Sequence, residues 1–447
     1  MRNLVWVLAV ILLVVGLVAG YFAGKSSVGS QQQVTTTGGT VTTTITKTKT
    51  VTQTETKTVS AGGLQGTIKI GALLPLTGDL GSYGKRNAEA VKMAEADFNK
   101  FLEEIDANWR LKVIIEDTET SKDKALEKLQ ILAAQGVKAV VGPMASSEVS
   151  NVKNYADSNK IVIVSQSSTA MSLALPDDYI FRLCTPDKVQ SRVLAKMIHD
   201  DGRKVLITIW RGDPWGDGLA STTKSIFKEL GGIVDEGIRY PEDTADFSSF
   251  VESLANRVNS YLEQGYTTDD IAILLISFDE VQQIFQTASQ YDILGEVKWY
   301  GTDGTALNSK IIEDPVAAAF AVKVKFSNTI YSAGFSEKAE MLRERLRAKL
   351  GETPDSYAIT AYDAVWLIGL TIQFTQEYDG EVIKNMLPKV AEIYYGVTGW
   401  AKLDENGDRA QADYEIWEPV VSNGNYEWKL VGIYNSLSDS FNWLEEH

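Results

Sequence analysis

The sequence predicts an α/β protein built from two lobes, each a doubly wound parallel sheet with helices on both faces. From Thr67 onward, short runs rich in Val and Ile alternate with longer segments of helical periodicity, and strands joined by such crossovers are typically parallel and buried. The alternation restarts after YIFRLCTPD (179–187), which indicates a second lobe. A chain of 447 residues is long enough for two or three domains.

The first series of expected strands consists of short apolar runs. These runs are TIKIGALL (67–74), LKVIIED (111–117), AVVGP (139–143) and KIVIVS (160–165). Between the first two lies a segment whose apolar residues, among them Val91, Phe98 and Ile105, fall on one helical face. The stretch from 67 to 105 therefore predicts a strand, a glycine-rich turn and a helix.

The second series has the same character and ends in a different kind of section. Its expected strands are KVLITIW (204–210), GGIVDEGIRY (231–240), DIAILLIS (270–277), VKWYG (297–301) and AAAFAVKVKF (317–326). Two long helical patterns follow at 335–350 and 356–374. The section 396–435 contains the turn signals ENGD and SNGN and is expected to form β-strands and turns.

Charge and composition exclude several classes of function. Lys and Arg total 43 against 59 Asp and Glu, a formal charge of −16 that repels nucleic acid and anionic lipid. The single cysteine, Cys184, excludes an internal disulfide. Two histidines, His199 and His447, leave almost nothing for a zinc site. We expect no cofactor, no metal and no nucleic-acid partner.

The N-terminus predicts export of the body of the protein. The apolar run 4–24 is about long enough to span a bilayer as a helix, and residues 1–24 are either a membrane anchor or a cleaved signal peptide. Arg2 and the amino terminus place the preceding side in the cytoplasm. The body is therefore expected at the outer face of a cell membrane, or secreted or periplasmic if the helix is cleaved.

A threonine-rich segment follows at 25–65. It lacks large apolar side chains at helical spacing, so it cannot offset the entropy of ordering by burial and is expected to be disordered. Tracts of this composition are often O-glycosylated stalks. A stalk favours retention of the N-terminal helix as a transmembrane anchor.

The glycine-rich turn PLTGDLGSYGKRNAEA (75–90) does not fit a nucleotide site. Five residues separate Gly78 from Gly84, where a Walker loop has four, and Arg86 stands where its hydroxyl residue belongs. The glycines also lack the Rossmann spacing. We expect a different ligand here, with Tyr83 exposed in the turn.

Loops at the carboxyl ends of the strands predict a binding surface, because ligands of open parallel sheets bind there. They contain hydroxyls, glycines, aromatic rings and a few carboxylates, and they lie at 76–84, 142–150, 165–172, 210–218, 277–280 and 301–306. No nucleophile–base pair is recognisable among them. We therefore expect a binding protein and not an enzyme.

Six motifs in this order resemble the type I periplasmic binding proteins of ABC transporters, within them the leucine/isoleucine/valine-binding branch. They are GALLPLTGDLGSYG, VVGPMASSEVSNV, IVIVSQSSTA, YIFRLCTPD, WGDGLA and GVTGWAKLDENGDR, and the resemblance covers roughly 66–447. It implies two lobes joined by three crossovers. With it we assign 66–186 plus 327–410 to the N-terminal lobe and 187–326 plus 411–447 to the C-terminal lobe.

The resemblance also implies an anion-binding side of the cleft. Ser146 matches a serine at the start of the helix after the third strand, and Thr169 matches a threonine after the fourth. Both are expected at helix N-termini, where backbone N–H groups and the helix dipole favour a carboxylate. Ser167 matches a position that contributes backbone groups, so its side chain, alanine in the family, matters little.

The remaining expected ligand-binding residues come from the turn and the second lobe. Tyr83 matches a lid tyrosine, and Asp303 stands where many amino-acid binders place the partner of the α-ammonium. Trp215 and Phe278 fall near aromatic positions of the second lobe. Together the residues match a zwitterion whose two charges are satisfied only when the cleft closes.

Each assignment has a plainer alternative. Ser146 is also suited to capping its helix, Tyr83 to packing on the surface and Asp303 to forming a turn. Asp187, which follows the crossover, is placed either to reach the ligand or to cap the helix at Lys188, and we favour the cap.

The leading hypothesis is an extracytoplasmic solute-binding protein that delivers a branched-chain or related amino acid to an ABC permease. Binding proteins for amides, urea or aromatic acids share the framework and remain alternatives. A sensory receptor ectodomain is a further alternative, although only SDSFNWLEEH (438–447) follows the body in the sequence.

Overall fold

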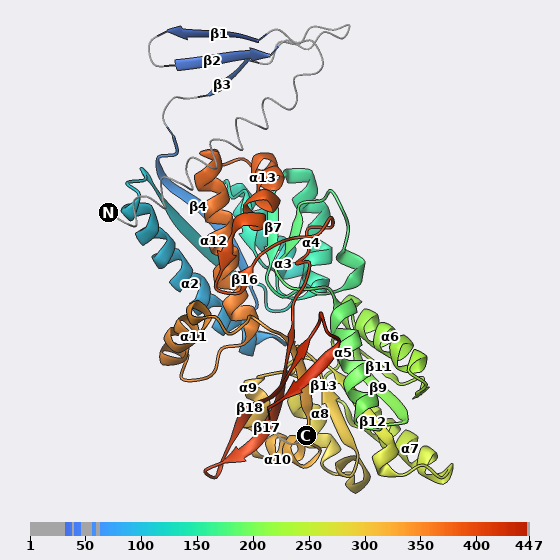
Figure 1. Ribbon diagram of the computed structural model, residues 1–447. Helices are drawn as coiled ribbons and strands as arrows, with labels where there is room; N and C mark the ends of the chain where they lie inside the picture. The colour runs from blue at the N-terminus through green and yellow to red at the C-terminus, as the bar shows by residue number, and fades with distance from the viewer. Residues whose placement is uncertain (1–31, 38–39, 46–55, 60–62, 445–447) are drawn as a thin grey trace, which may run out of the picture.

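The computed structural model describes residues 32–37, 40–45, 56–59 and 63–444. The expected membrane anchor or signal peptide at 1–24 lies outside these residues. Two lobes account for residues from 63 onward, one above the other in Figure 1.

The first lobe contains a five-stranded sheet of order β5-β4-β6-β7-β8, and all of its pairs are parallel. Its strands are β4 (Gly66–Leu74), β5 (Trp109–Asp117), β6 (Ala139–Val141), β7 (Val162–Ser165) and β8 (Ile180–Arg182). Its helices are α2 (Gly81–Glu104), α3 (Lys122–Ala134), α4 (Ser146–Asn159), α11 (Glu337–Leu350), α12 (Ser356–Thr375) and α13 (Gly380–Ile393). The short hairpin β15 (Tyr395–Gly396) and β16 (Gly399–Trp400) follows α13.

The second lobe contains a nine-stranded mixed sheet of order β10-β9-β12-β13-β14-β17-β18-β19, with β11 also paired to β9. Its parallel strands are β9 (Val205–Gly212), β10 (Ile233–Val234), β11 (Ile238–Pro241), β12 (Ile271–Ile276), β13 (Lys298–Gly301) and β14 (Ser327–Tyr331). The antiparallel strands are β17 (Tyr414–Ser422), β18 (Asn425–Asn435) and β19 (Ser440–Trp443).

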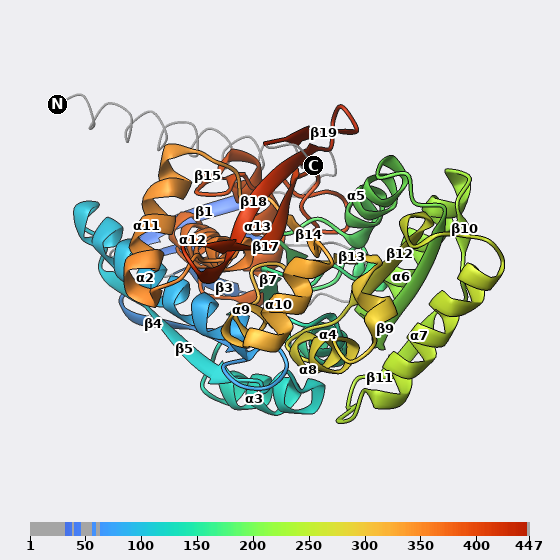
Figure 2. The same cartoon turned by 90° about the horizontal axis from the view of Figure 1, so that it is seen from below.

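Helices cover both faces of this second sheet. They are α5 (Asp187–Asp200), α6 (Pro214–Glu229), α7 (Ser248–Glu263), α8 (Val281–Ala288), α9 (Ser309–Glu313) and α10 (Pro315–Lys323). Alternate residues of β12 belong to different apolar clusters: Leu274 to the one that includes residues of α5 and α6, and Ile273 to the one that includes residues of α7, α8 and α10. This alternation is what a strand buried on both faces requires. Figure 2 shows α7 along the outer edge of the lobe.

Short 3₁₀ turns complete the element list at Met171–Leu173, Thr268–Asp270 and Asp292–Gly295. The chain passes between the lobes three times: between β8 and α5, between β14 and α11, and between β16 and β17. The second passage follows β14, which pairs with β13 and β17. The assignment of 327–331 to the N-terminal lobe is therefore wrong, since this strand completes the second sheet.

The run 317–326 was expected to be a strand, and most of it is helix α10. Asp314 caps this helix by accepting from the backbone N–H groups of Val316 and Ala317, at 3.0 and 2.8 Å. Pro315 occupies the first turn, where its missing N–H is harmless. The run of alanines has high helix propensity, so the cap and composition outweigh the apolar character that suggested a strand.

Part of the threonine-rich segment also differs from expectation. Strands β1 (Gln32–Thr37), β2 (Thr40–Ile45) and β3 (Thr56–Val59) form an antiparallel sheet of order β1-β2-β3. The expectation that 25–65 lacks regular structure is therefore wrong for these strands. Threonine is β-branched and favours strands, a preference that does not depend on the burial of apolar side chains.

Helix α12 is a central helix of the first lobe and packs against α2 and α13. In the described part of the chain it is the helix with the length and hydropathy of a membrane span. Its most apolar window is 72% buried, as expected for the core helix of a globular lobe.

Candidate functional site

A small cavity of about 30 Å³ lies between the lobes. Its lining includes six of the seven residues assigned from the sequence: Tyr83, Ser146, Ser167, Trp215, Phe278 and Asp303. Leu80, Met144, Ala145, Gly304 and Tyr357 complete the lining. The loops at the carboxyl ends of strands from both sheets therefore meet at one place, as the strand order requires.

The glycine-rich turn serves close packing of backbone. Gly78 has φ +81°, and a Cβ there would lie 2.1 Å from the Glu119 carbonyl oxygen. A Cβ on Gly84 would lie 1.9 Å from the Pro75 carbonyl oxygen. Neither position has room for a side chain, so the two glycines allow the turn and the start of α2 to fold tightly against the end of β4.

Tyr83 lies in the first turn of α2 and is only 1% exposed, so the expectation of an exposed turn residue is wrong. Its hydroxyl donates a hydrogen bond of 2.6 Å to the carbonyl oxygen of Ala306, which follows β13 in the second lobe. The ring is buried because the second lobe covers it. Tyr83 thus joins the lobes as well as lining the cavity.

The loops after β6 and β7 are hydrogen-bonded to each other beside the cavity. The Ser146 hydroxyl lies 3.0 Å from the Ser168 hydroxyl and accepts from the Ala170 N–H at 3.3 Å. The Ser167 hydroxyl donates to the Met144 carbonyl oxygen at 3.1 Å. Ser146 is the first residue within α4 and Ala145 is the N-cap, so the alternative of Ser146 as the cap is wrong.

Thr169 is buried behind this surface and does not line the cavity. Its carbonyl oxygen accepts from the N–H of Asp187 at 2.9 Å. Thr169 therefore connects the loop after β7 to the start of α5. Its expected place at a helix N-terminus is also wrong, because the next residues form only a short 3₁₀ turn at 171–173.

Asp303 is buried at the side of the cavity formed by the second lobe. Tyr357, at the start of α12 in the first lobe, donates its hydroxyl to Oδ2 at 2.6 Å. The other oxygen, Oδ1, has no hydrogen-bond partner among the described residues. Burial raises the pKa of Asp303 to about 6, and the hydrogen bond from Tyr357 lowers it in part.

Asp187 is buried at the start of α5 and, like Thr169, does not line the cavity. The N-cap of α5 is Pro186, and Asp187 makes no cap hydrogen bond, so the interpretation as a helix cap is wrong. Its carboxylate is fully buried, and neither oxygen has a partner in hydrogen-bond geometry within the described residues. Burial and then the charge of Asp303 raise its pKa well above the usual range.

Two aromatic rings form an apolar wall of the cavity. Trp215 and Phe278 stack with ring centroids 4.8 Å apart and planes 15° from parallel. A Cβ on Gly304 would come within 2.8 Å of Trp215 and 2.9 Å of Phe278, so glycine is needed beside them. The Arg211 guanidinium covers Phe278, with Cζ 4.2 Å from the ring centroid.

The arrangement is suited to holding a small molecule that has both polar and apolar parts. Hydroxyls and the N-terminus of α4 lie at one side, where they favour an anionic group. Asp187 and Asp303 favour a cation, since two unneutralised buried carboxylates repel each other. No group of His, Cys, Asp and Glu able to hold a metal occurs in the part of the chain that the structure describes.

Comparison with known proteins places residues 86–422 in the family described as the receptor family ligand binding region. An uncharacterized protein of Methanocaldococcus jannaschii is 33% identical over 86% of this chain and 94% of its own length. A leucine-, isoleucine-, valine-, threonine- and alanine-binding protein of Pseudomonas aeruginosa is 24% identical over 79% of this chain and 90% of its own.

Solved structures with the same fold include proteins of differing ligands. A leucine-binding protein of Thermotoga maritima has a TM-score of 0.67 at 22% identity, covering 81% of this chain and 97% of its own. A solute-binding protein of Rhodopseudomonas palustris, in complex with 3,4-dihydroxybenzoic acid, has a TM-score of 0.66 at 17% identity, covering 81% and 96%. At these identities the likeness establishes the fold alone.

Proposed function

Since the chain belongs to the type I periplasmic binding protein family, matched as the receptor family ligand binding region over 86–422, we propose that it captures an amino acid for an ABC importer. Proteins of this family bind ligands and are not enzymes. The proposed ligand is a branched-chain or related amino acid, held between the lobes and delivered to a membrane permease. The proposed location is outside the cytoplasm, with the N-terminal segment as the anchor.

The observation that carries this proposal is the pair of buried carboxylates, Asp187 and Asp303. Three of their four oxygens have no partner in hydrogen-bond geometry among the described residues, although the Thr169 hydroxyl lowers the pKa of Asp187 and the Gln190 side chain lowers that of Asp303. Burying a carboxylate without a partner is costly, and an opposite charge relieves that cost. A primary ammonium carries three N–H donors and one positive charge, which complements these oxygens.

The opposite end of the ligand is assigned to the first lobe. The backbone N–H groups at the start of α4 have no partner within the helix, and Ser146 and Ser167 lie beside them. An α-carboxylate at this place gains charge-assisted hydrogen bonds. The apolar side chain then lies against Trp215 and Phe278.

An aromatic acid is the alternative ligand, because the stacked rings also suit a flat apolar group. Such an acid has no ammonium, so it leaves Asp187 and Asp303 unneutralised in the closed cleft. An uncharged amide has the same deficiency. The carboxylate pair therefore favours the amino acid.

The test is a ligand panel measured by thermal unfolding of the full-length protein. The panel contains L-leucine, L-isoleucine, L-valine, acetamide, urea, benzoate and 3,4-dihydroxybenzoate. A ligand at a hundredfold excess over its Kd stabilises the native state by about 2.7 kcal/mol, which raises Tm. Elevation by the amino acids supports the proposal. Elevation by amides or aromatic acids alone contradicts the assigned ligand and keeps the binding role.

A further inference from the structure

Besides the contacts made by Tyr83 and Tyr357, a second set of direct contacts joins the lobes at the rim of the cleft, through residues that do not line the cavity. The first lobe contributes Asp79 and Ser82, and the second contributes Asp279, which follows the cavity residue Phe278. The Ser82 hydroxyl donates to Asp279 Oδ1 at 2.6 Å, and the Ser82 N–H donates to Oδ2 at 3.3 Å. The Asp279 N–H donates to the Asp79 carbonyl oxygen at 2.9 Å.

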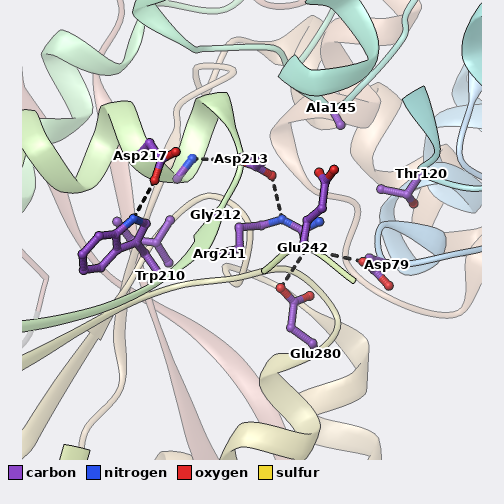
Figure 3. Close-up of polar contacts among 12 residues, drawn as sticks. Asp79, Thr120, Ala145, Trp210, Arg211, Gly212, Asp213, Asp217, Glu242 and Glu280 are labelled. Carbon is purple, nitrogen blue, oxygen red and sulfur yellow. Dashed lines mark hydrogen bonds and ion pairs between the residues drawn. The ribbon is translucent and has the colours of Figure 1, made fainter. Parts of the chain in front are cut away.

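An ionic contact extends this rim. The side chain of Arg211 is only 3% exposed and pairs within its own lobe with Asp213 at 2.7 Å and Glu280 at 2.8 Å. Its Nη1 also reaches Asp79 of the other lobe at 3.4 Å. Figure 3 shows Arg211 between these three carboxylates. Because two of the partners share its lobe, the guanidinium is held in position whether or not Asp79 is present.

The rim contacts are coupled to the cavity through the chain itself. Ser82 directly precedes Tyr83, and Asp279 directly follows Phe278. Each of the two bonded residues is therefore next in sequence to a residue that lines the cavity. Arg211 covers the face of Phe278 as well. Formation of the rim contacts therefore positions an aromatic side chain from each lobe.

We propose that Asp79, Ser82, Asp279 and Arg211 form a latch that closes the lobes and sets the affinity for the ligand without touching it. The inference rests on the proposed function for its ligand and on the inter-lobe distances for its mechanism. These four are positioning residues: their bonds across the cleft exist only when the lobes are together. Ligand binding and latch formation then stabilise the same closed state, so each strengthens the other.

The binding test is a double-mutant cycle on the full-length protein, with L-leucine as the probe in calorimetric titration. Ser82→Ala removes one hydroxyl and Asp279→Ala removes its acceptor. We expect each to raise Kd by about tenfold, the effect of a hydrogen bond to a charged group. The double variant is expected to bind little worse than Asp279→Ala alone, because the two residues share one interaction. Unchanged affinity or fully additive losses would overturn the latch.

The control substitution is in a second ion pair between the lobes. Lys122 and Glu242 join the lobes at 2.9 Å, but their side chains are 50% and 32% exposed. Exposed pairs contribute little, so Glu242→Gln is expected to change Kd by less than about threefold. Asp279 also accepts a hydrogen bond from Asn308 in its own lobe, so Asp279→Ala removes a contact within the second lobe as well. The Ser82 side chain makes no second hydrogen bond among the described contacts. A loss of affinity in Ser82→Ala therefore cannot be explained by a disturbed second lobe.

A distance measurement separates failure of the latch from failure of the assigned ligand. Spin labels on Asp123→Cys and Asp243→Cys, exposed positions next to the Lys122–Glu242 contact, report the separation of the lobes. We expect Ser82→Ala and Asp279→Ala to shift the distribution toward longer distances. If L-leucine does not bind, the amino-acid assignment fails, and this shift still supports the latch. A distribution identical to that of the parent protein in both variants overturns the latch whatever the ligand is.

Discussion

In the proposed complex, Asp303 is the residue that distinguishes an amino acid from other small ligands, because it lines the cavity and pairs with the ammonium. Its Oδ2 is held by Tyr357 of the opposite lobe and its Oδ1 is unpaired among the described residues. The hydrogen bond fixes the carboxylate in place, and the unpaired oxygen is left for the ligand. Asp187 does not line the cavity, but it adds a second buried carboxylate whose charge acts on Asp303 and that the ammonium of the proposed ligand would also neutralise.

Asp303→Asn is expected to weaken L-leucine binding by about ten- to hundredfold, because a hydrogen bond between charged groups is replaced by one to a neutral amide. Titration calorimetry measures this loss. Asp243→Asn, at an exposed position of the same lobe, is the control and is expected to have no effect. Equal loss of affinity for acetamide and for L-leucine would contradict the ammonium assignment.

The titration of Asp303 gives opposite pH effects with and without ligand. Its pKa in the native protein is about 6, raised by burial, so the native state binds its proton more tightly than the unfolded chain does. This contribution to stability is present at acid pH and is lost as pH rises through about 6. Asp187, and Glu148 with a pKa of about 7, act in the same direction.

We therefore expect these groups to raise the Tm of the unliganded protein as pH falls from 7 to 5. Over the same range the affinity for L-leucine is expected to fall, because the carboxylates become protonated. Melting curves and titrations at matched pH values measure both. In Asp303→Asn the pH dependence of affinity should become shallower. Binding that strengthens toward pH 5 would show that the ligand does not pair with these carboxylates.

Among the elements, the turn from β4 into α2 has the tightest demands on its sequence. It must bring Tyr83 over the cavity and Ser82 to the rim, and it does so through backbone approaches that only glycine permits. Gly84 meets the Pro75 carbonyl, whereas a Cβ on Gly81 would lie 3.6 Å from the nearest atom, an ordinary contact.

Gly84→Ala is therefore expected to destabilise the protein by about 1–3 kcal/mol, the range for forced overpacking. Gly81→Ala is the matched control in the same helical turn and is expected to change stability by less than about 0.5 kcal/mol. Urea unfolding followed by circular dichroism measures both. Similar stabilities of the two variants would contradict the close packing of this turn.

For the whole molecule, the third crossover is firmly attached to the first lobe. Arg182 of β8 and Asp408 of the crossover form a buried bidentate ion pair, and Arg182 also donates to the carbonyl oxygens of Ser168 and Ala170. The Arg409 N–H donates to the Arg182 carbonyl oxygen at 2.9 Å. One arginine thus links the hinge region to the loop that lines the cavity.

Asp408→Asn is expected to destabilise the protein by about 3–5 kcal/mol, because it leaves the buried Arg182 charge without its partner. The control is Asp439→Asn, which breaks the partly exposed pair with Arg192 and is expected to change stability by less than about 1 kcal/mol. Both values come from urea unfolding. A loss for Asp408→Asn as small as that of the control would show that Arg182 is not held as described.

Local sequence patterns are sufficient to predict the two α/β lobes, most of the parallel strands and the loops that meet at the cleft. These follow from local periodicity, since a strand buried on both faces must be apolar throughout and a covering helix must be apolar on one side. The resemblance to the family added six of the residues that line the cavity. The run 317–326 was misassigned because a short apolar segment fits a strand or a helix equally well, and Asp314 and Pro315 decided between them.

Four features depend on contacts between distant segments and could not be predicted from local patterns. They are the membership of β14 in the second sheet, the burial of Tyr83, the unpaired carboxylate of Asp187 and the contact of Ser82 with Asp279. Each depends on segments far apart in the chain: Ser82 and Asp279 are separated by 197 positions. Local sequence patterns indicate which side chains are buried but not which distant residues cover them. Pairing across the cleft is therefore a property of the folded, closed molecule.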